Sequence, residues 1–233
     1  MASFVIAEIG VNWDGDFDLV KEMIENAKKA NCNAVKFQAF NEEIIKDHPE
    51  STRLIKSSIS KSNVKKIDEI AKSIGIEWFC TPMYSDAVDF LDPFVNRYKM
   101  RWFDGNKIVK NENSNIIKKI LKTKKEVIIS SEISPKNSQY HNNPYIKWLY
   151  CVPKYPCSLE DFDFSKLNEF DGFSNHYPQF IAPLTAAILG AKIIEVHITS
   201  DKTKEFFDNN VSFDYDELSE LMNTIRQSEK IKK

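Results

Sequence analysis

The sequence lacks the features that mark several large classes of protein. Its 233 residues carry a formal net charge of -2 and no block of like charge, so no basic surface for nucleic acid is predicted. No apolar run approaches the ~18 residues that a membrane span requires. The first ten residues have no basic leader and carry Glu8 within an apolar stretch, which argues against a secretory signal peptide. We therefore expect a protein that binds neither nucleic acid nor membranes.

A disulfide framework is also missing from the pattern. The four cysteines, Cys32, Cys80, Cys151 and Cys157, form no CxxC pair. Cys80 and Cys151 lie inside apolar runs, where a cysteine behaves as a small hydrophobic residue. This use of cysteine is typical of a reducing compartment, and we expect a cytoplasmic protein.

What the sequence does contain is a regular alternation of apolar, β-branched runs with amphipathic segments. The eight strand-like runs are Phe4–Ile9, Ala34–Phe40, Ile76–Thr81, Arg97–Trp102, Glu126–Ser131, Ile146–Val152, Gly172–His176 and Lys192–Thr199. Segments with helical apolar spacing include Leu19–Ala30, Val64–Ile74, Ile116–Lys122, Phe180–Leu189 and Tyr215–Ile225. The alternation predicts a parallel sheet, and eight units predict its closed form, a single (β/α)₈ TIM-barrel domain over residues 1–233.

Two stretches depart from the regular alternation. Between Ser131 and Ile146 the chain is rich in proline and asparagine and too short for a full helix, so the fifth crossover helix is predicted to be missing or reduced to a turn. A flank without its helix would expose apolar surface, and self-association into a homo-oligomer is a hypothesis on that ground. The stretch Asn41–Asn63 is long and polar, and we expect it to be an active-site loop.

Polar and charged side chains stand late in most of the strand-like runs. They are Glu8, Lys36, Gln38, Thr81, Lys99, Arg101, Ser130, Ser174, His176, Glu195 and His197. Charged residues inside β-strands cost free energy unless they are paired or bind a ligand. A structural ion pair would explain any one of them alone. Their combination at strand ends, where barrel enzymes carry their catalytic groups, favours an active site.

Two of the four histidines are candidate metal ligands. His176 and His197 end adjacent predicted strands with compatible side-chain parity, and imidazole is the commonest metal ligand in proteins. The signal is only moderately specific because no HxxxH or HExxH spacing accompanies it. His48 and His141 lie in polar loops and are expected to be solvated.

These residues resemble the sialic acid synthase (N-acetylneuraminate synthase) family. The resemblance starts with Ile6-Ala-Glu-Ile-Gly-Val-Asn12 and Ala34-Val-Lys-Phe-Gln38, which are the more specific motifs. It continues in order through Thr81-Pro82, Tyr98-Lys99, Ile128-Ile-Ser130, Cys151 with Tyr155-Pro156, Ser174-Asn-His176 and Glu195-Val-His197. It covers nearly the whole chain.

The resemblance implies a fold, a reaction and a set of site residues. The family's TIM barrel condenses phosphoenolpyruvate with the open-chain aldehyde of an acylamino sugar, a transferase reaction of carbohydrate biosynthesis. His176 and His197 would hold Mn²⁺ or Mg²⁺, which polarises the aldehyde. Lys36 and Lys99 would neutralise phosphoenolpyruvate, with hydroxyls of Thr81, Ser130 and Ser174. Glu8, Gln38, Tyr155 and Asp208 would face the sugar and the metal-bound water.

The chain also departs from the family pattern. Where the family has Ile-Gly-Ser-Gly-Glu after the Tyr-Lys pair, this chain has Met100-Arg-Trp-Phe-Asp104, and we expect Arg101 either to bind the anion or to fill the pocket. Glu132 is expected near the phosphate site, where it would be unfavourable. The family's C-terminal antifreeze-like domain is expected to be absent.

The departures leave two other interpretations open. One is a metal-dependent lyase or aldolase-type enzyme that acts on a different substrate. The other is a non-catalytic barrel that binds a sugar acid.

Overall fold

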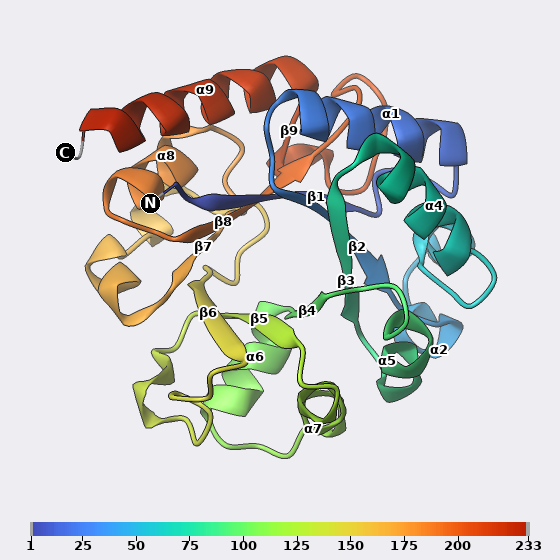
Figure 1. Cartoon of the computed structure of the whole chain (residues 1–233), viewed down its shortest axis with the longest axis horizontal. Helices are drawn as coiled ribbons and strands as arrows, with labels where there is room; N and C mark the ends of the chain where they lie inside the picture. Colours follow the sequence, from blue (N-terminus) through green and yellow to red (C-terminus); the bar gives the residue numbers. More distant parts are fainter. Residues whose placement is uncertain (1, 232–233) are drawn as a thin grey trace.

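The computed structural model describes residues 2–231 and has a ring of parallel strands with helices outside it (Figure 1). The eight barrel strands are β1 (Phe4–Gly10), β2 (Ala34–Ala39), β3 (Glu77–Pro82), β4 (Arg97–Met100), β5 (Glu126–Ser131), β6 (Ile146–Tyr150), β7 (Gly172–Ser174) and β8 (Ile193–Ile198). Each strand pairs with the next, and β1 also pairs with β8, which closes the barrel. A short additional strand, β9 (Ser212–Phe213), pairs with the last two residues of β8. The predicted TIM barrel is confirmed.

The longer helices form where apolar residues recur at helical spacing. They are α1 (Phe17–Lys29), α4 (Val64–Ile74), α5 (Ser85–Leu91), α6 (Trp102–Val109), α7 (Asn115–Lys122), α8 (Ile181–Ile188) and α9 (Tyr215–Ile231). In α1 the Asp16 side chain caps the first turn by accepting hydrogen bonds from the backbone N–H groups of Asp18 and Leu19. Its buried residues, from Val20 to Ala27, all lie on the face that packs on the barrel.

Residues 132–145 contain only the short 3₁₀ helix η2 (Pro135–Asn137), so the predicted loss of the fifth crossover helix is confirmed. The sixth crossover is also reduced, to the 3₁₀ helices η3 (Leu159–Asp161) and η4 (Phe164–Glu169). Phenylalanine rings from this crossover cover the barrel there, with Phe162 and Phe164 both packed edge-on against Phe173 of β7. Aromatic side chains therefore cover the outside of the barrel here, where a helix covers it elsewhere.

The predicted fourth strand was too long at its C-terminal end. The strand stops at Met100, and Trp102 begins α6. The helix can start so close to the barrel because Gly105 has no side chain: a Cβ there would lie 1.9 Å from the backbone oxygen of Ser130. Arg101 has extended backbone angles and occupies the N-cap position, where its backbone oxygen accepts hydrogen bonds from the N–H groups of Asp104 and Gly105.

The predicted loop over residues 41–63 is compact and partly helical. It contains α2 (Glu42–Ile45), α3 (Ser51–Leu54) and the 3₁₀ helix η1 (Ile55–Ser57). A further 3₁₀ helix, η5 (Asn209–Val211), follows β8. Both segments lie beyond the C-terminal ends of their strands and help to form the mouth of the barrel.

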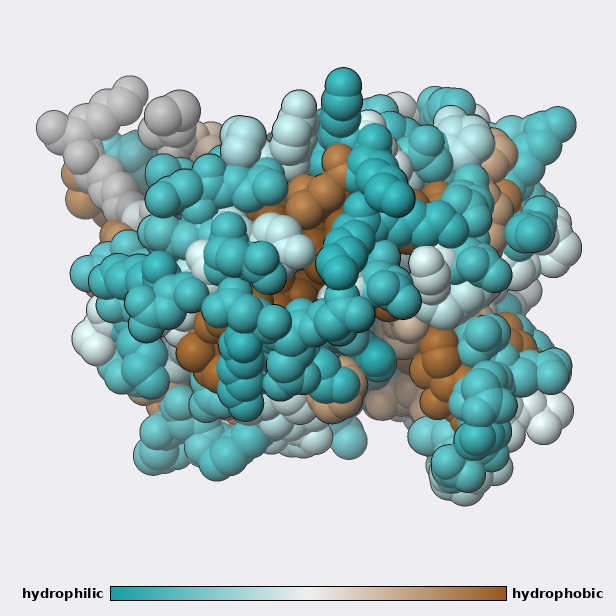
Figure 2. Space-filling model, turned by 90° about the horizontal axis from the view of Figure 1, so that it is seen from below, coloured by the Kyte–Doolittle hydropathy of each residue, from teal (hydrophilic) through white to brown (hydrophobic). Residues whose placement is uncertain are grey.

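Hydrophilic side chains predominate on the face shown in Figure 2, and hydrophobic ones show there in separate patches. Ile188 and Leu189 at the end of α8 are about half exposed, at 51% and 57%. None of the helices within residues 2–231 has the length and apolar character needed to span a membrane. Self-association remains a hypothesis.

Candidate active site

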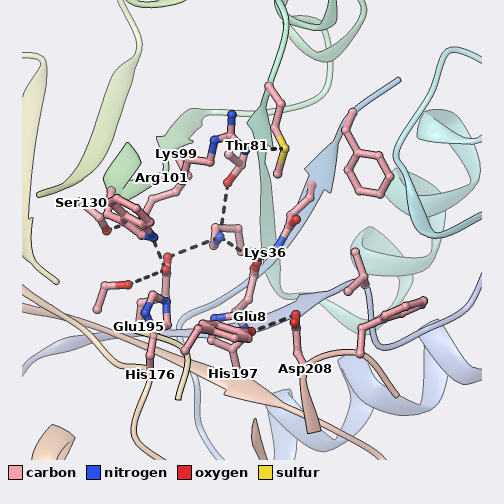
Figure 3. Close-up of a pocket in the computed structure, with 18 of the residues that line it drawn as sticks. Glu8, Lys36, Thr81, Lys99, Arg101, Ser130, His176, Glu195, His197 and Asp208 are labelled. Atoms are coloured by element: carbon pink, nitrogen blue, oxygen red, sulfur yellow. Dashed lines mark hydrogen bonds and ion pairs between the residues drawn. The ribbon is translucent and has the colours of Figure 1, made fainter. Parts of the chain in front are cut away.

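A cavity of about 470 Å³ opens at the C-terminal ends of the barrel strands (Figure 3). All twelve site residues predicted from the sequence line it: Glu8, Lys36, Gln38, Thr81, Lys99, Arg101, Ser130, Tyr155, Ser174, His176, His197 and Asp208. They come from segments far apart in the chain, because parallel strands bring all their C-terminal ends to one rim. The volume is within the range typical of small-molecule sites.

Two buried lysines form the floor of the cavity. Lys36 Nζ lies 2.9 Å from Glu8 Oε1 and 3.7 Å from Glu195 Oε2. Lys99 Nζ lies 3.4 Å from Glu195 Oε1. Glu195 therefore bridges the two cations. Each of the four side chains is at most 5% exposed, so these charges interact with little screening by solvent.

Three hydroxyl groups complete the floor. Lys36 donates to Thr81 Oγ1 at 3.3 Å, and Lys99 donates to Ser130 Oγ at 2.7 Å. Ser174 donates to Glu195 Oε1 at 2.9 Å. Cations and hydroxyls thus converge from β2, β3, β4, β5 and β7, which is the arrangement that a phosphate or carboxylate would need.

The charges on the floor shift one another's titration. Burial lowers the pKa of Lys36, but the carboxylates of Glu195 and Glu8 outweigh it, so its pKa lies above the ordinary value. For Lys99, burial together with the charge of Lys36 outweighs Glu195, and the pKa is lowered. Burial alone would raise the pKa of Glu195, yet Lys36 and Lys99 lower it to about 2. Glu195 is therefore ionised at neutral pH. Of the two lysines, Lys99 loses its proton more readily than Lys36.

The two candidate metal ligands lie side by side on the wall formed by β7 and β8. The ring centroids of His176 and His197 are 5.5 Å apart. His176 Nδ1 lies 3.3 Å from the backbone oxygen of Val152, and His197 Nδ1 lies 3.5 Å from Asp208 Oδ2. These contacts favour a proton on each Nδ1. The Nε2 atom of each ring then keeps its lone pair, which can bind a metal ion. Burial, with a smaller contribution from the neighbouring His197, lowers the pKa of His176 to about 3, so its ring is neutral.

The donor set fits a divalent cation that keeps open positions. Within residues 2–231, no three His, Cys, Asp or Glu side chains are arranged as a metal-binding cluster. The two imidazoles would supply nitrogen ligands, and Glu8, paired with His197 in the β1–β8 register, has a buried Oε2 with no hydrogen-bond partner among these residues. A metal held there would take its remaining ligands from water or substrate, as catalytic sites do.

Tyr155 and Gln38 extend the polar surface toward the mouth. The Tyr155 ring lies 4.8 Å from the His176 ring, and its hydroxyl is 3.4 Å from His197 Nδ1. Gln38 donates to Glu8 Oε1 at 2.9 Å. The close packing of this corner depends on Gly10, which has a φ of +56° and where a Cβ would lie 3.0 Å from Asp208 Oδ2.

Of the residues that depart from the family pattern, some line the cavity and one does not. Arg101 and Trp102 both line the cavity, but Arg101 Nε donates to Asp104 Oδ2 at 2.7 Å, so its charge is already partly matched. Glu132 is exposed, and the cavity lining does not include it. The expectation that Glu132 lies at the phosphate site was wrong. The strand ends at Ser131, whose hydroxyl accepts a hydrogen bond from the backbone N–H of Ile133 and turns the chain away.

Sequence reasoning marked Glu195 as a polar residue late in its strand but assigned it no role, and it did not mark several other lining residues. Glu195 lies on the same face of its strand as His197, and this position was enough to predict that it faces the site. His48 is exposed as expected, yet it lines the mouth of the cavity. The remaining ones are apolar or lie in loops: Val11, Phe40, Ile44, Ile45, Leu54, Met83, Trp102, Cys151 and Phe207. No pattern in the sequence marks an apolar loop residue as part of a site.

The fold and the site together define a (β/α)₈-barrel protein with a polar, cation-lined pocket at its catalytic end. The chain belongs to the NeuB family, whose model matches residues 23–233. The predicted resemblance to sialic acid synthases is thereby confirmed.

Curated relatives extend over nearly the whole chain. A protein of Methanocaldococcus jannaschii is 33% identical over 98% of this chain and 72% of its own length. The pseudaminic acid synthase of Campylobacter jejuni is 29% identical over 97% of this chain and 74% of its own. The relatives also include an N,N'-diacetyllegionaminic acid synthase of Legionella pneumophila, which is 29% identical over 99% of this chain and 73% of its own.

Solved structures agree with the sequence relatives. The N-acetylneuraminic acid (sialic acid) synthetase of Leptospira borgpetersenii, in complex with citrate, superposes with a TM-score of 0.89 at 28% identity, covering 99% of this chain and 85% of that one. A truncated 3-deoxy-D-arabino-heptulosonate 7-phosphate synthase of Thermotoga maritima reaches a TM-score of 0.73 at 11% identity, covering 99% of this chain and 87% of that one; this likeness is one of fold alone.

Proposed function

We propose that this protein condenses phosphoenolpyruvate with the open-chain aldehyde of an acylamino sugar and releases a 2-keto sugar acid and phosphate. The observation that carries the proposal is the convergence of Lys36 and Lys99 beside the His176–His197 pair in one cavity. A trianionic substrate needs more than one buried cation, and an aldehyde acceptor needs an electrophilic activator nearby. The sugar acid synthases among the relatives support the same reaction class.

Lys36 and Lys99 would bind the phosphate and carboxylate of phosphoenolpyruvate, with hydroxyls of Thr81, Ser130 and Ser174 as further donors. In the structure these lysines are paired with Glu8 and Glu195. The incoming anion would share the lysines with these carboxylates, which keep both cations in place while the pocket is empty of substrate. Preorganised charges of this kind need little rearrangement during the reaction.

The reaction joins C3 of phosphoenolpyruvate to the aldehyde carbon. The aldehyde oxygen takes up a proton, water adds at C2, and phosphate leaves to give the 2-keto group. Asp208 and Tyr155, which both contact His197, would hold the sugar hydroxyls, and Gln38 would hold the sugar from the β2 side. A divalent cation on His176 and His197, Mn²⁺ or Mg²⁺, would polarise the aldehyde oxygen as a Lewis acid.

Calorimetric titration of phosphoenolpyruvate into protein with added Mn²⁺ tests the anion site. We expect binding in the parent chain and its loss in Lys99→Met. Lys147→Met is the matched control, because Lys147 is also a strand lysine but is not among the residues that line the cavity. A screen of aldoses for a 2-keto acid product then tests the reaction. Equal phosphoenolpyruvate affinity in Lys99→Met and Lys147→Met would refute the assignment.

One observation favours a second candidate, an aldolase-type enzyme. Lys99 is buried beside another cation and its pKa is lowered, which are the conditions that let a lysine amine attack a carbonyl. Such an enzyme would form an imine between Lys99 Nζ and a keto substrate, with loss of water. Borohydride reduction with pyruvate would then attach a stable adduct to Lys99, detectable by mass spectrometry. Phosphoenolpyruvate turnover without any adduct would exclude this candidate.

A further inference from the structure

Above the charged floor, one side of the cavity is lined by apolar side chains. Val11 follows β1, Phe40 follows β2 and Met83 follows β3, each two or three positions after the polar lining residue of its own strand. Because the C-terminal ends of the strands point toward the mouth, these apolar residues lie one step nearer the entrance. Figure 3 shows side chains without polar atoms on the side of the cavity away from Lys99 and Ser130.

The segment over residues 41–57 supplies the rest of this apolar wall. Ile44 and Ile45 come from α2 and Leu54 from α3, and Phe207 faces them from the segment after β8. Val11, Phe40 and Leu54 form a small buried cluster of their own, separate from the barrel core, and Phe207 packs against it. We call the seven residues Val11, Phe40, Ile44, Ile45, Leu54, Met83 and Phe207 the apolar wall.

Arg53 holds the apolar wall in place. Its Nη2 lies 2.6 Å from Asp14 Oδ2, and the same atom donates to the backbone oxygen of Glu205. Its guanidinium lies over the Phe207 ring, 4.6 Å from the ring centroid. Three segments, after β1, after β2 and after β8, are thus tied together at the mouth. The wall is a built surface of the pocket, and a substrate would meet it without first ordering a loop.

We propose that the apolar wall is a subsite for a methyl group at the end of the acceptor sugar farthest from its aldehyde. The inference rests on the proposed function, because that function fixes the orientation of the sugar. The aldehyde carbon must lie between the lysine floor and the histidines to reach phosphoenolpyruvate. The far end of the sugar then extends toward the mouth, where a terminal hydroxymethyl group would lose hydrogen bonds to water against this wall. The preferred acceptor is therefore a terminally deoxygenated acylamino sugar.

The test compares two ligands that differ in one hydroxyl group. We would titrate the alditols of an N-acetylhexosamine and of its 6-deoxy analogue into the Mn²⁺-supplemented protein, since alditols bind without turnover. A hydrophobic pocket discriminates poorly against an added hydroxyl, so we expect the 6-deoxy alditol to bind about tenfold more tightly. Turnover of the two parent aldoses with phosphoenolpyruvate is measured in parallel.

Ile44→Ser is the informative variant, because Ile44 is 37% exposed and its loss should not unfold the barrel. We expect this change to remove most of the preference for the 6-deoxy ligand. Ile188→Ser is the matched control: Ile188 is also an exposed helical isoleucine, it does not line the cavity, and the preference should remain.

The outcomes separate the two proposals. Equal affinity for the two alditols, or a preference that survives Ile44→Ser, overturns the apolar subsite even if turnover is observed. A preference lost in Ile44→Ser but without turnover of any aldose supports the subsite and refutes the proposed reaction. Absence of binding by either alditol refutes the subsite.

Discussion

The floor and the mouth of the cavity are built on opposite principles. On the floor, Lys36, Lys99 and Glu195 are buried within 3.7 Å of an opposite charge and belong to regular strands. At the mouth, the apolar wall comes mostly from segments outside the strands and is fixed by the partly exposed residue Arg53. The contrast indicates that the chemistry is carried by the rigid barrel and the choice of substrate by the segments above it.

The most severe change that would test this division is Lys36→Met on the floor. It leaves Glu8 and Glu195 with one buried cation fewer, and breaking a buried ion pair costs about 3–5 kcal/mol of stability. Loss of a charge that stabilises the reacting anion should lower activity by about 10²–10³-fold. Urea unfolding and product formation measure the two effects. Lys147→Met should change neither, and a Lys36→Met protein with full activity would contradict the floor's catalytic role.

The next largest effect should be on metal binding. We expect His197→Ala to lose Mn²⁺ binding in calorimetry while circular dichroism shows the barrel intact. Asp208→Asn, which changes the residue beside His197 Nδ1, should weaken Mn²⁺ by about 10–100-fold.

His48→Ala is the control at the mouth. His48 also lines the cavity, where its ring packs edge-on against Phe207, and Mn²⁺ affinity should not change. Unaltered Mn²⁺ affinity in His197→Ala would refute the assignment of the metal site to His176 and His197.

Gly10→Ala tests how tightly the corner around Asp208 and Gln38 is packed. At both Gly10 and Gly75 the backbone is left-handed, so alanine should cost about 1–2 kcal/mol at either position. Only at Gly10 would the new Cβ press on Asp208, Gln38 and Glu8, whereas at Gly75 nothing lies within 4 Å. We expect about tenfold lower activity in Gly10→Ala and full activity in Gly75→Ala, because small displacements of positioning groups reduce rate. Similar activity in both variants would show that the corner tolerates displacement.

The smallest effect is expected at Arg53, which ties the segments around the apolar wall together. Arg53→Ala removes partly exposed ion pairs, which contribute roughly 0.2–1 kcal/mol each. The sugar KM should rise a few-fold while phosphoenolpyruvate affinity stays constant. Steady-state kinetics with each substrate varied in turn measures this split. A fall in phosphoenolpyruvate affinity would show that the mouth and the floor are not independent.

Sequence patterns predicted the floor better than the mouth. Strand alternation alone places Lys36 with Gln38 and Glu195 with His197, because side-chain direction in a strand depends only on position parity. The resemblance to a family added Tyr155 and Asp208, which lie outside the strands and which no periodicity marks. Arg101 was predicted on the correct side of the barrel but within a strand that in fact ends one residue earlier.

The sequence by itself determined the barrel, the missing fifth helix and the polar residues at the strand ends. These follow from local rules: the period of apolar residues, the placement of proline and asparagine, and the cost of a charge inside a strand. Only the tertiary structure decided that Glu195 bridges both lysines, that Glu132 faces solvent, and that Leu54 and Phe207 meet at the mouth. The bridge depends on how strands far apart in the sequence pack around the barrel, and the other two outcomes depend on the paths of loops. No local rule fixes either.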